Sequence, residues 1–196
     1  FCSRLLKSKG ILKFLNSAKV FKQHNFIVFG SRDSSKKDSI SQKELDYYKN
    51  NFKNIIIEGN KINPLLSRDI NFPILIVPSS YSEGLPRSIL EALSLGIPVI
   101  CTKKASCGIF DQRSIYIIDE FNLKSFDKVI KKLIHDINNK KIFTKLDYGF
   151  ELVQGNLTED KIVELTIQVY NKILDNKSGS LIISKDNSNL INWISN

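Results

Sequence analysis

The stretch between residues 74 and 101 constrains the fold of this 196-residue chain more than any other segment. It contains two short runs of apolar residues, at 74–77 and 97–101. Between them lie a polar loop and a segment with helical spacing that begins at Pro86 and ends before Gly96, the usual positions of these residues in a helix. Continuous apolar strands joined through a helix are typical of a parallel sheet that is buried on both faces. The stretch therefore predicts a strand–helix–strand unit.

The same alternation extends through most of the chain. The predicted strands cover residues 25–29, 54–57, 74–77, 97–101 and 115–118, and the predicted helices cover residues 8–21, 41–51, 86–95, 123–137 and 158–174. Strands that alternate with helices predict an α/β protein with a doubly wound (Rossmann-like), mostly parallel sheet. We expect one domain over residues 1–175. Beyond Asp175 the composition shifts to Asn, Ser, Lys and Gly, which predicts a polar tail over residues 176–196.

The composition narrows the class of protein. A hydrophobic fraction of 42% and a charged fraction of 25% are ordinary for a soluble globular protein. The apolar runs are shorter than the roughly 18 residues that suggest a membrane span. The three cysteines, Cys2, Cys101 and Cys107, have no CxxC spacing, and the chain has only two histidines. Neither a disulfide framework nor a zinc site is expected, and we predict a cytoplasmic protein.

The formal charge of +9 allows two interpretations. An excess of positive charge attracts anions such as nucleotide phosphates, an acidic membrane surface or a nucleic acid. Lysine is also abundant throughout the chain, and we interpret the excess mainly as this compositional bias. Nucleic acid is not expected as a partner, because the aromatic residues fall mostly in apolar segments and do not interleave with a basic stripe.

Two carboxylates lie around the loop and the helix of the central unit. Glu83 is in the polar loop, and Glu91 is about one and a half turns inside the helix. In open α/β sheets, ligands bind at the loops that follow the carboxyl ends of the strands. These side chains are therefore candidates for ligand binding. Taken singly, each is better interpreted as a solvated surface residue, and only the residues around them favour a functional role.

The residues around these carboxylates resemble a known family. In order, they are Pro78-Ser-Ser, Glu83-Gly-Leu-Pro, Glu91-Ala-Leu and Gly96-Ile-Pro-Val. This order resembles the carboxyl-terminal, donor-binding domain of the GT-B glycosyltransferases, particularly the retaining enzymes of family 4. The amino-terminal Ser3-Arg-Leu, followed by Lys9-Gly, resembles the segment that opens this domain. The resemblance covers roughly residues 1–175.

The resemblance implies a role for each motif residue. Arg4, Lys9 and Glu83 would be catalytic. The two cations would stabilise the leaving diphosphate, which gains negative charge as the glycosidic bond breaks. Glu83 would accept hydrogen bonds from hydroxyl groups of the donor sugar. Glu91 would hold the ribose hydroxyls of the nucleotide.

The remaining motif residues would bind the substrate through their backbone. These residues are Gly84, Leu85 and Pro86. Gly84 lets the chain approach the ligand closely, and the helix that begins at Pro86 offers free backbone N–H groups and the positive end of its dipole. The chain has no Asp-x-Asp pair of the kind that holds a divalent cation on a diphosphate. We therefore expect no metal ion and no cofactor.

The family also implies a reaction and partners. The expected activity is transfer of a sugar from a UDP- or GDP-sugar to a glycan or a lipid-linked acceptor in surface polysaccharide biosynthesis. An upstream domain would bind the acceptor, and the enzyme could contact the inner face of the membrane as a peripheral protein. Without that domain, the chain is expected to bind nucleotide but to transfer sugar poorly. The alternative is a non-catalytic nucleotide-sugar-binding or regulatory subunit of a split transferase.

Overall fold

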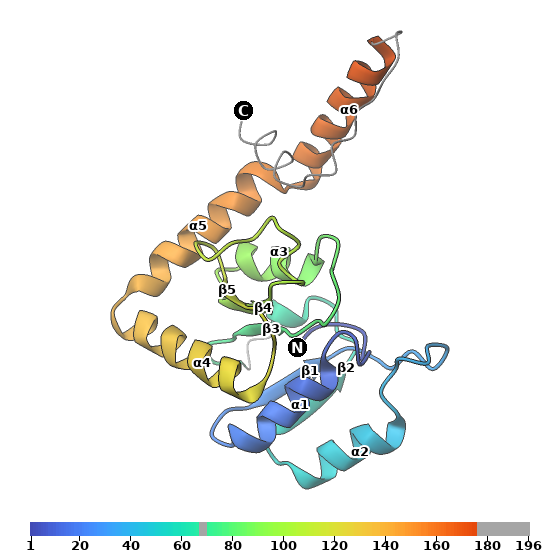
Figure 1. Cartoon of the computed structure of the whole chain (residues 1–196), viewed down its shortest axis with the longest axis vertical. Helices are drawn as coiled ribbons and strands as arrows, with labels where there is room; N and C mark the ends of the chain where they lie inside the picture. Colours follow the sequence, from blue (N-terminus) through green and yellow to red (C-terminus); the bar gives the residue numbers. More distant parts are fainter. Residues whose placement is uncertain (67–69, 176–196) are drawn as a thin grey trace.

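The computed structural model describes residues 1–66 and 70–175, so the tail predicted for residues 176–196 lies outside the described residues. Helices and strands alternate along the chain (Figure 1). The strands are β1 (Phe26–Phe29), β2 (Ile55–Gly59), β3 (Leu75–Val77), β4 (Val99–Thr102) and β5 (Tyr116–Ile118). The helices are α1 (Ile11–Val20), α2 (Gln42–Asn51), the short 3-10 helix η1 (Pro64–Leu66), α3 (Arg87–Ser94), α4 (Leu123–Asn138), α5 (Lys141–Asn156) and α6 (Glu159–Asp175).

The described strands form two parallel sheets. One contains β1 and β2, and the other has the order β3–β4–β5. In the larger sheet, Leu75 lies opposite Val99 and Ile100 lies opposite Tyr116. The predicted α/β class with parallel strands is confirmed. The strands were expected in one sheet, whereas β1 and β3 are not paired with each other.

Both faces of the larger sheet are buried, as its continuous apolar strands predicted. Alternate residues point to opposite faces of a strand. One set, Ile76, Ile100, Tyr116 and Ile118, packs in a core cluster with residues of α1 and α4. The opposite set packs with α3 and α5, and it comprises Leu75, Val99 and Cys101. The sheet is therefore enclosed by helices on both sides, which leaves its strand ends as the accessible places for a ligand.

The five predicted helices are present as α1, α2, α3, α4 and α6, and the short helix η1 was not predicted. Helix α2 begins with a capping box, in which the Ser41 side chain accepts from the Glu44 N–H while the Glu44 carboxylate accepts from the Ser41 N–H. Helix α5 was not predicted. It packs against α3 and α4, and α6 continues outward from its end (Figure 1). None of the described helices is both long and apolar enough to cross a membrane.

Candidate functional site

Two loops meet at the carboxyl end of β3. One loop precedes α1 and the other follows β3. Gly10 adopts a φ of 83°, and a Cβ atom at this position would lie 2.3 Å from the Pro78 carbonyl oxygen. The Ser80 N–H and hydroxyl both donate to the Ser8 carbonyl oxygen, at 2.8 and 3.0 Å. A glycine and a pair of hydrogen bonds therefore bring residues 72 positions apart together.

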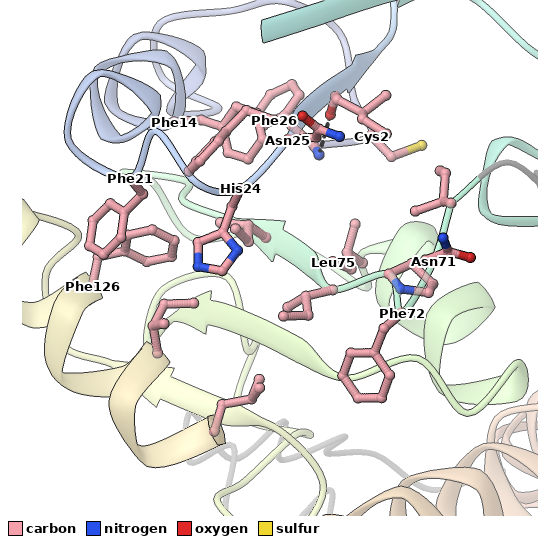
Figure 2. Close-up of a pocket in the computed structure, with 18 of the residues that line it drawn as sticks. Cys2, Phe14, Phe21, His24, Asn25, Phe26, Asn71, Phe72, Leu75 and Phe126 are labelled. Carbon is pink, nitrogen blue, oxygen red and sulfur yellow. Dashed lines mark hydrogen bonds between the residues drawn. The ribbon is translucent and has the colours of Figure 1, made fainter. Parts of the chain in front are cut away.

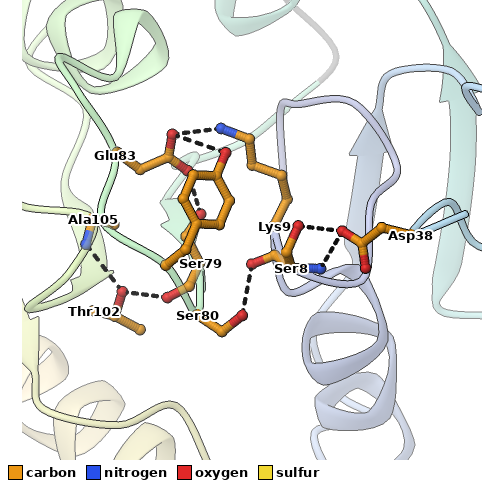
Figure 3. Close-up of polar contacts among 9 residues, drawn as sticks. Ser8, Lys9, Asp38, Ser79, Ser80, Glu83, Thr102 and Ala105 are labelled. Atoms are coloured by element: carbon orange, nitrogen blue, oxygen red, sulfur yellow. Dashed lines mark hydrogen bonds and ion pairs between the residues drawn. The ribbon is translucent and has the colours of Figure 1, made fainter. Parts of the chain in front are cut away.

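This contact places Lys9 beside Glu83 (Figure 3). The Lys9 ammonium donates to Glu83 Oε2 at 2.5 Å. The two side chains are only 17% and 8% exposed, so solvent screens their attraction little. Two of the three residues predicted as catalytic are thus joined directly.

The hydroxyl groups of Ser79 and Tyr81 hold the Glu83 carboxylate in one orientation. The Ser79 hydroxyl donates to its Oε1 at 2.5 Å, and the Tyr81 hydroxyl donates to its Oε2 at 3.3 Å. Thr102, at the end of β4, donates to the Ser79 carbonyl oxygen at 2.7 Å. The Glu83 N–H donates to the Lys104 carbonyl oxygen at 3.2 Å. The loop after β3 is therefore tied to β4 and to the loop that follows it.

The surroundings of Lys9 favour its charged form. Burial alone would lower the pKa of Lys9, but the hydrogen bonds and charges of Glu83 and Tyr81 outweigh it, so the pKa is raised above its usual value. The Tyr81 ring adds a cation–π contact, with Lys9 Nζ 5.0 Å from its centre. Lys9 is therefore a fixed positive charge at neutral pH, and the Glu83 carboxylate balances it.

A cavity of about 470 Å³ opens beside this pair. Lys9, Glu83, Pro86 and Glu91 of the predicted residues line it. The full lining is Phe1, Cys2, Ser3, Lys9, Lys61, Asn63, Pro64, Ile76, Val77, Ser79, Glu83, Pro86, Arg87, Ser88 and Glu91. The two carboxylates proposed for the sugar and the ribose thus face one cavity.

The other predicted residues lie beside the cavity and are not part of its lining. Gly84 and Leu85 are in the loop between Glu83 and α3. The Arg4 side chain is 60% exposed, and its guanidinium lies 3.8 Å from the Asp33 carboxylate. The catalytic role of Arg4 stays a prediction.

The cavity also contains residues that sequence reasoning did not assign to it. Lys61, Asn63 and Pro64 come from the segment that follows β2, and Arg87 comes from the first turn of α3. Lys61 Nζ lies 2.8 Å from the Glu58 carboxylate. The 61–64 segment is far from the motif in sequence and has no motif of its own. The 61–64 segment reaches the site because β2, which precedes it, pairs with β1.

The start of α3 lies at this cavity. Pro86 is the N-cap residue, and no side chain caps the helix there. The first intrahelical bonds run from Ile89 and Leu90 to the Pro86 carbonyl oxygen. The N–H groups of Arg87 and Ser88, both of which line the cavity, precede these bonds. A helix start of this kind attracts anions, and the Arg87 side chain adds a positive charge.

No thiol or metal chemistry is indicated in the part of the chain that the structure describes. All three cysteines are free, and burial raises the pKa of each thiol, to about 12 for Cys101. Thiols with raised pKa values are poor nucleophiles at neutral pH. Within the described residues, His, Cys, Asp and Glu form no group of three that could hold a metal ion.

The fold and this cavity define a class of protein. The architecture is that of GT-B glycosyltransferases, and a glycosyltransferase from Rickettsia africae superimposes with a TM-score of 0.75 at 18% identity, over 90% of this chain and 47% of that one. The chain belongs to the glycosyl transferases group 1 family, whose sequence profile matches residues 1–146. The family resemblance predicted from the central motif is therefore confirmed.

Other known proteins are similar over the same region. The carboxyl-terminal domain of the glycosyl transferase group 1 protein LpcC from Francisella tularensis is 25% identical, with a TM-score of 0.57 over 77% of this chain and 80% of that domain. Anabaena HepE, in a structure with UDP, is 16% identical, with a TM-score of 0.68 over 89% of this chain and 47% of HepE. TuaC of Bacillus subtilis, named for glycosyl transfer in teichuronic acid biosynthesis, is 26% identical over 137 residues. The match covers 69% of this chain and 32% of TuaC.

Proposed function

We propose that this chain is the donor-binding domain of a retaining glycosyltransferase that transfers a sugar from a nucleotide diphosphate sugar to a glycan or lipid-linked acceptor. The observation that carries the proposal is the placement of Lys9, Glu83 and Glu91 around one cavity at the carboxyl end of β3. The acceptor would be bound by a separate domain. Because the chain spans less than half of TuaC and of the Rickettsia glycosyltransferase, both relatives have room for such a domain.

The diphosphate of the donor would compete with Glu83 for Lys9. Lys9 is the positive charge that contacts Glu83 directly, and Arg87 and Ser88 at the start of α3 line the same cavity. A diphosphate there would meet the Lys9 ammonium, the Arg87 guanidinium and the positive end of the helix. As the bond to the sugar breaks, the diphosphate gains negative charge, so these groups stabilise the transition state more than the bound substrate.

Release of Lys9 would leave Glu83 free to accept hydrogen bonds from sugar hydroxyls. Ser79 and Tyr81 already hold the carboxylate, so its position is set before the substrate arrives. Glu91 lines the same cavity from within α3 and would accept from the ribose hydroxyls. A structure of HepE contains UDP, and we propose a uridine or guanosine diphosphate sugar as the donor for this chain.

The setting of the reaction follows from the family and from one relative. TuaC is named for the biosynthesis of teichuronic acid, and we propose that this protein likewise assembles a surface polysaccharide. It would act in the cytoplasm, where nucleotide sugars are used, with a peripheral contact to the inner face of the membrane when the acceptor is lipid-linked. No metal ion is required in this proposal, because Lys9, Arg87 and the start of α3 supply the positive charge.

Calorimetry with UDP, UDP-glucose and GDP tests the proposal. Replacing Glu91 with Gln should weaken binding of the preferred nucleotide about tenfold or more, because hydrogen bonds to a charged acceptor contribute roughly 1.5–3 kcal/mol. The control Glu151→Gln changes an exposed carboxylate in α5 and should leave the affinity unchanged. Absence of binding at millimolar nucleotide, or equal affinities for the two variants, would contradict the proposal.

A further inference from the structure

The Asp38 carboxylate contacts the loop that carries Lys9, although Asp38 is not among the residues that line the cavity (Figure 3). Its Oδ2 atom accepts from the Ser8 N–H, at 3.1 Å, and also from the Ser8 hydroxyl. Asp38 is 30 positions from Ser8 in the sequence and belongs to the segment between β1 and α2. This segment contains none of the residues predicted for the site.

Ser8 connects Asp38 to the loop that carries Glu83. The Ser8 carbonyl oxygen accepts from both the N–H and the hydroxyl of Ser80. The residue before Ser80 is Ser79, whose hydroxyl donates to the Glu83 carboxylate. The chain is therefore held on both sides of Ser8, and Lys9 is the next residue.

Backbone pairing fixes Asp38 itself. The Lys7 N–H donates to the Asp38 carbonyl oxygen at 2.7 Å. Beside this bond, Leu6 and Ser39 form an antiparallel bridge. The Asp38 side chain is thus presented to Ser8 by a short antiparallel ladder. Because the ladder is made by the backbone, a change of the Asp38 side chain leaves its hydrogen bonds in place.

Packing fixes the chain on the other side of Lys9. Helix α1 begins shortly after Lys9, and its Phe14 ring lies 5.0 Å from the Phe26 ring of β1, between ring centres. At the end of α1, the Phe21 ring lies 5.2 Å from the Phe126 ring of α4. All four rings line an apolar groove of about 480 Å³ (Figure 2). Since α1 is held in this way, the freedom left to Lys9 depends on the residues that precede it.

We propose that Asp38 is a positioning residue for Lys9, and that it strengthens the binding of a diphosphate through Ser8 without touching the ligand. This proposal rests on the proposed function, in which Lys9 binds the diphosphate of the donor. A carboxylate suits the task, because hydrogen bonds to a charged acceptor are shorter and stronger than those to a neutral one. A loop that is already ordered binds its ligand without a further loss of conformational freedom.

The sign of the effect distinguishes positioning from charge. As a negative charge near Lys9, Asp38 repels a diphosphate, so removal of the charge alone would strengthen binding. As a positioning residue, Asp38 favours binding, so removal of its hydrogen bonds weakens the affinity. The two effects change the affinity for a diphosphate in opposite directions.

Calorimetry with UDP tests the proposal on three variants. Asp38→Ala removes both hydrogen bonds and should weaken binding about tenfold. Asp38→Asn removes the charge but keeps an acceptor oxygen, so its affinity should stay within about threefold of that of the unsubstituted chain. The control Asp46→Ala removes an exposed carboxylate of α2, which accepts from the Gln42 side chain, and should leave the affinity unchanged.

Two further measurements separate positioning from general damage to the fold. Uridine has no phosphate, so its affinity, measured by NMR titration, should be the same for Asp38→Ala and the unsubstituted chain. The second measurement is the hydrogen exchange of the Lys9 ammonium, followed by NMR without nucleotide. In Asp38→Ala this exchange should be at least about fivefold faster, because the contact between Lys9 and Glu83 opens more often.

Three results would overturn the proposal. They are UDP binding that is unchanged or tighter in Asp38→Ala, equal losses of UDP and uridine affinity in that variant, and an unchanged exchange rate of the Lys9 ammonium. If the unsubstituted chain binds no UDP, the proposed function fails. The Lys9 exchange rate then still decides whether Asp38 positions Lys9, because it is measured without nucleotide.

Discussion

At the scale of single residues, the candidate site is a set of charges that satisfy one another. Lys9 and Glu83 are both largely buried, and each would be costly to leave unpaired. Their direct contact satisfies both charges, and in the proposed function a diphosphate would have to replace the carboxylate as the partner of Lys9. A ligand that is only a sugar offers Lys9 no negative charge in exchange. The pair therefore favours ligands that carry both an anion and hydroxyls.

The position of Lys9 depends on the glycine that follows it. Replacing Gly10 with Ala should destabilise the fold by about 3 kcal/mol, from the positive φ and from the contact of the new Cβ with the Pro78 carbonyl. Gly96→Ala is the matched control, because Gly96 also has a positive φ, 64°, but a Cβ added there would meet no atom within 4 Å. Gly96→Ala should lower the free energy of unfolding by only about 1–2 kcal/mol.

Urea unfolding of both glycine variants measures the difference. If Gly10→Ala and Gly96→Ala lose the same free energy of unfolding, the close approach of the two loops does not constrain the chain. Lys9 would then need another explanation for its position.

At the scale of elements, periodicity predicted most of the structure. The apolar runs became β1 to β5, and the predicted helix at 41–51 became α2, which begins with a capping box of Ser41 and Glu44. Helix α5 was not predicted, because Gly149 and Gly155 are poor helix formers and interrupt its helical pattern of apolar residues. The structure supplies the reason for the first glycine: a Cβ at Gly149 would lie 2.8 Å from Leu93 Cδ2 of α3. The sequence shows the glycine but not the neighbouring helix that requires it.

The two glycines of α5 should respond in opposite directions to alanine. Gly149→Ala gains helix propensity but forces Leu93 to move, so we expect a net loss of about 1–2 kcal/mol. Gly155→Ala meets no atom within 4 Å and should gain up to about 1 kcal/mol. Thermal and urea unfolding of the two variants give the signs. Stabilisation by both substitutions would show that α3 and α5 do not pack this closely.

At the scale of the whole molecule, pairing between distant segments determined what the sequence did not reveal. The motif predicted Glu83 and Glu91 in one site, and the cavity contains both. Lys61 and Asn63 line the cavity only because β2 lies beside β1. Arg4 lies close to Asp33 because the loop after β1 brings that carboxylate near it. The division of the strands into two sheets was also not predicted from the sequence, because it depends on which strand edges form hydrogen bonds with each other.

In a chain produced to begin at Phe1, the buried ammonium of Phe1 should make stability depend on pH. The pKa of the Phe1 ammonium is lowered from 8.0 to about 5 by desolvation. Between these values the unfolded state binds a proton that the folded state does not, so stability rises with pH from about 5 to 8. For the chain that begins at Phe1, the free energy of unfolding should be about 1–3 kcal/mol lower at a pH of about 5.5 than at a pH of about 7.5.

Acetylation of the Phe1 nitrogen provides the control, because it removes this titration and should flatten the dependence in the same interval. Urea unfolding at the two pH values measures both chains. An identical slope with and without acetylation would mean that the ammonium is not desolvated in the folded protein.

The most direct test of the central claim is a crystal structure of the chain with UDP-glucose, or with GDP-mannose if calorimetry favours guanosine. We expect a diphosphate in the cavity beside β3, within hydrogen-bond distance of Lys9 Nζ and of the N–H groups at the start of α3, with the 2.5 Å contact between Lys9 and Glu83 broken. Glu91 should contact the ribose. A nucleotide bound elsewhere, or one bound with the Lys9–Glu83 contact intact, would contradict it.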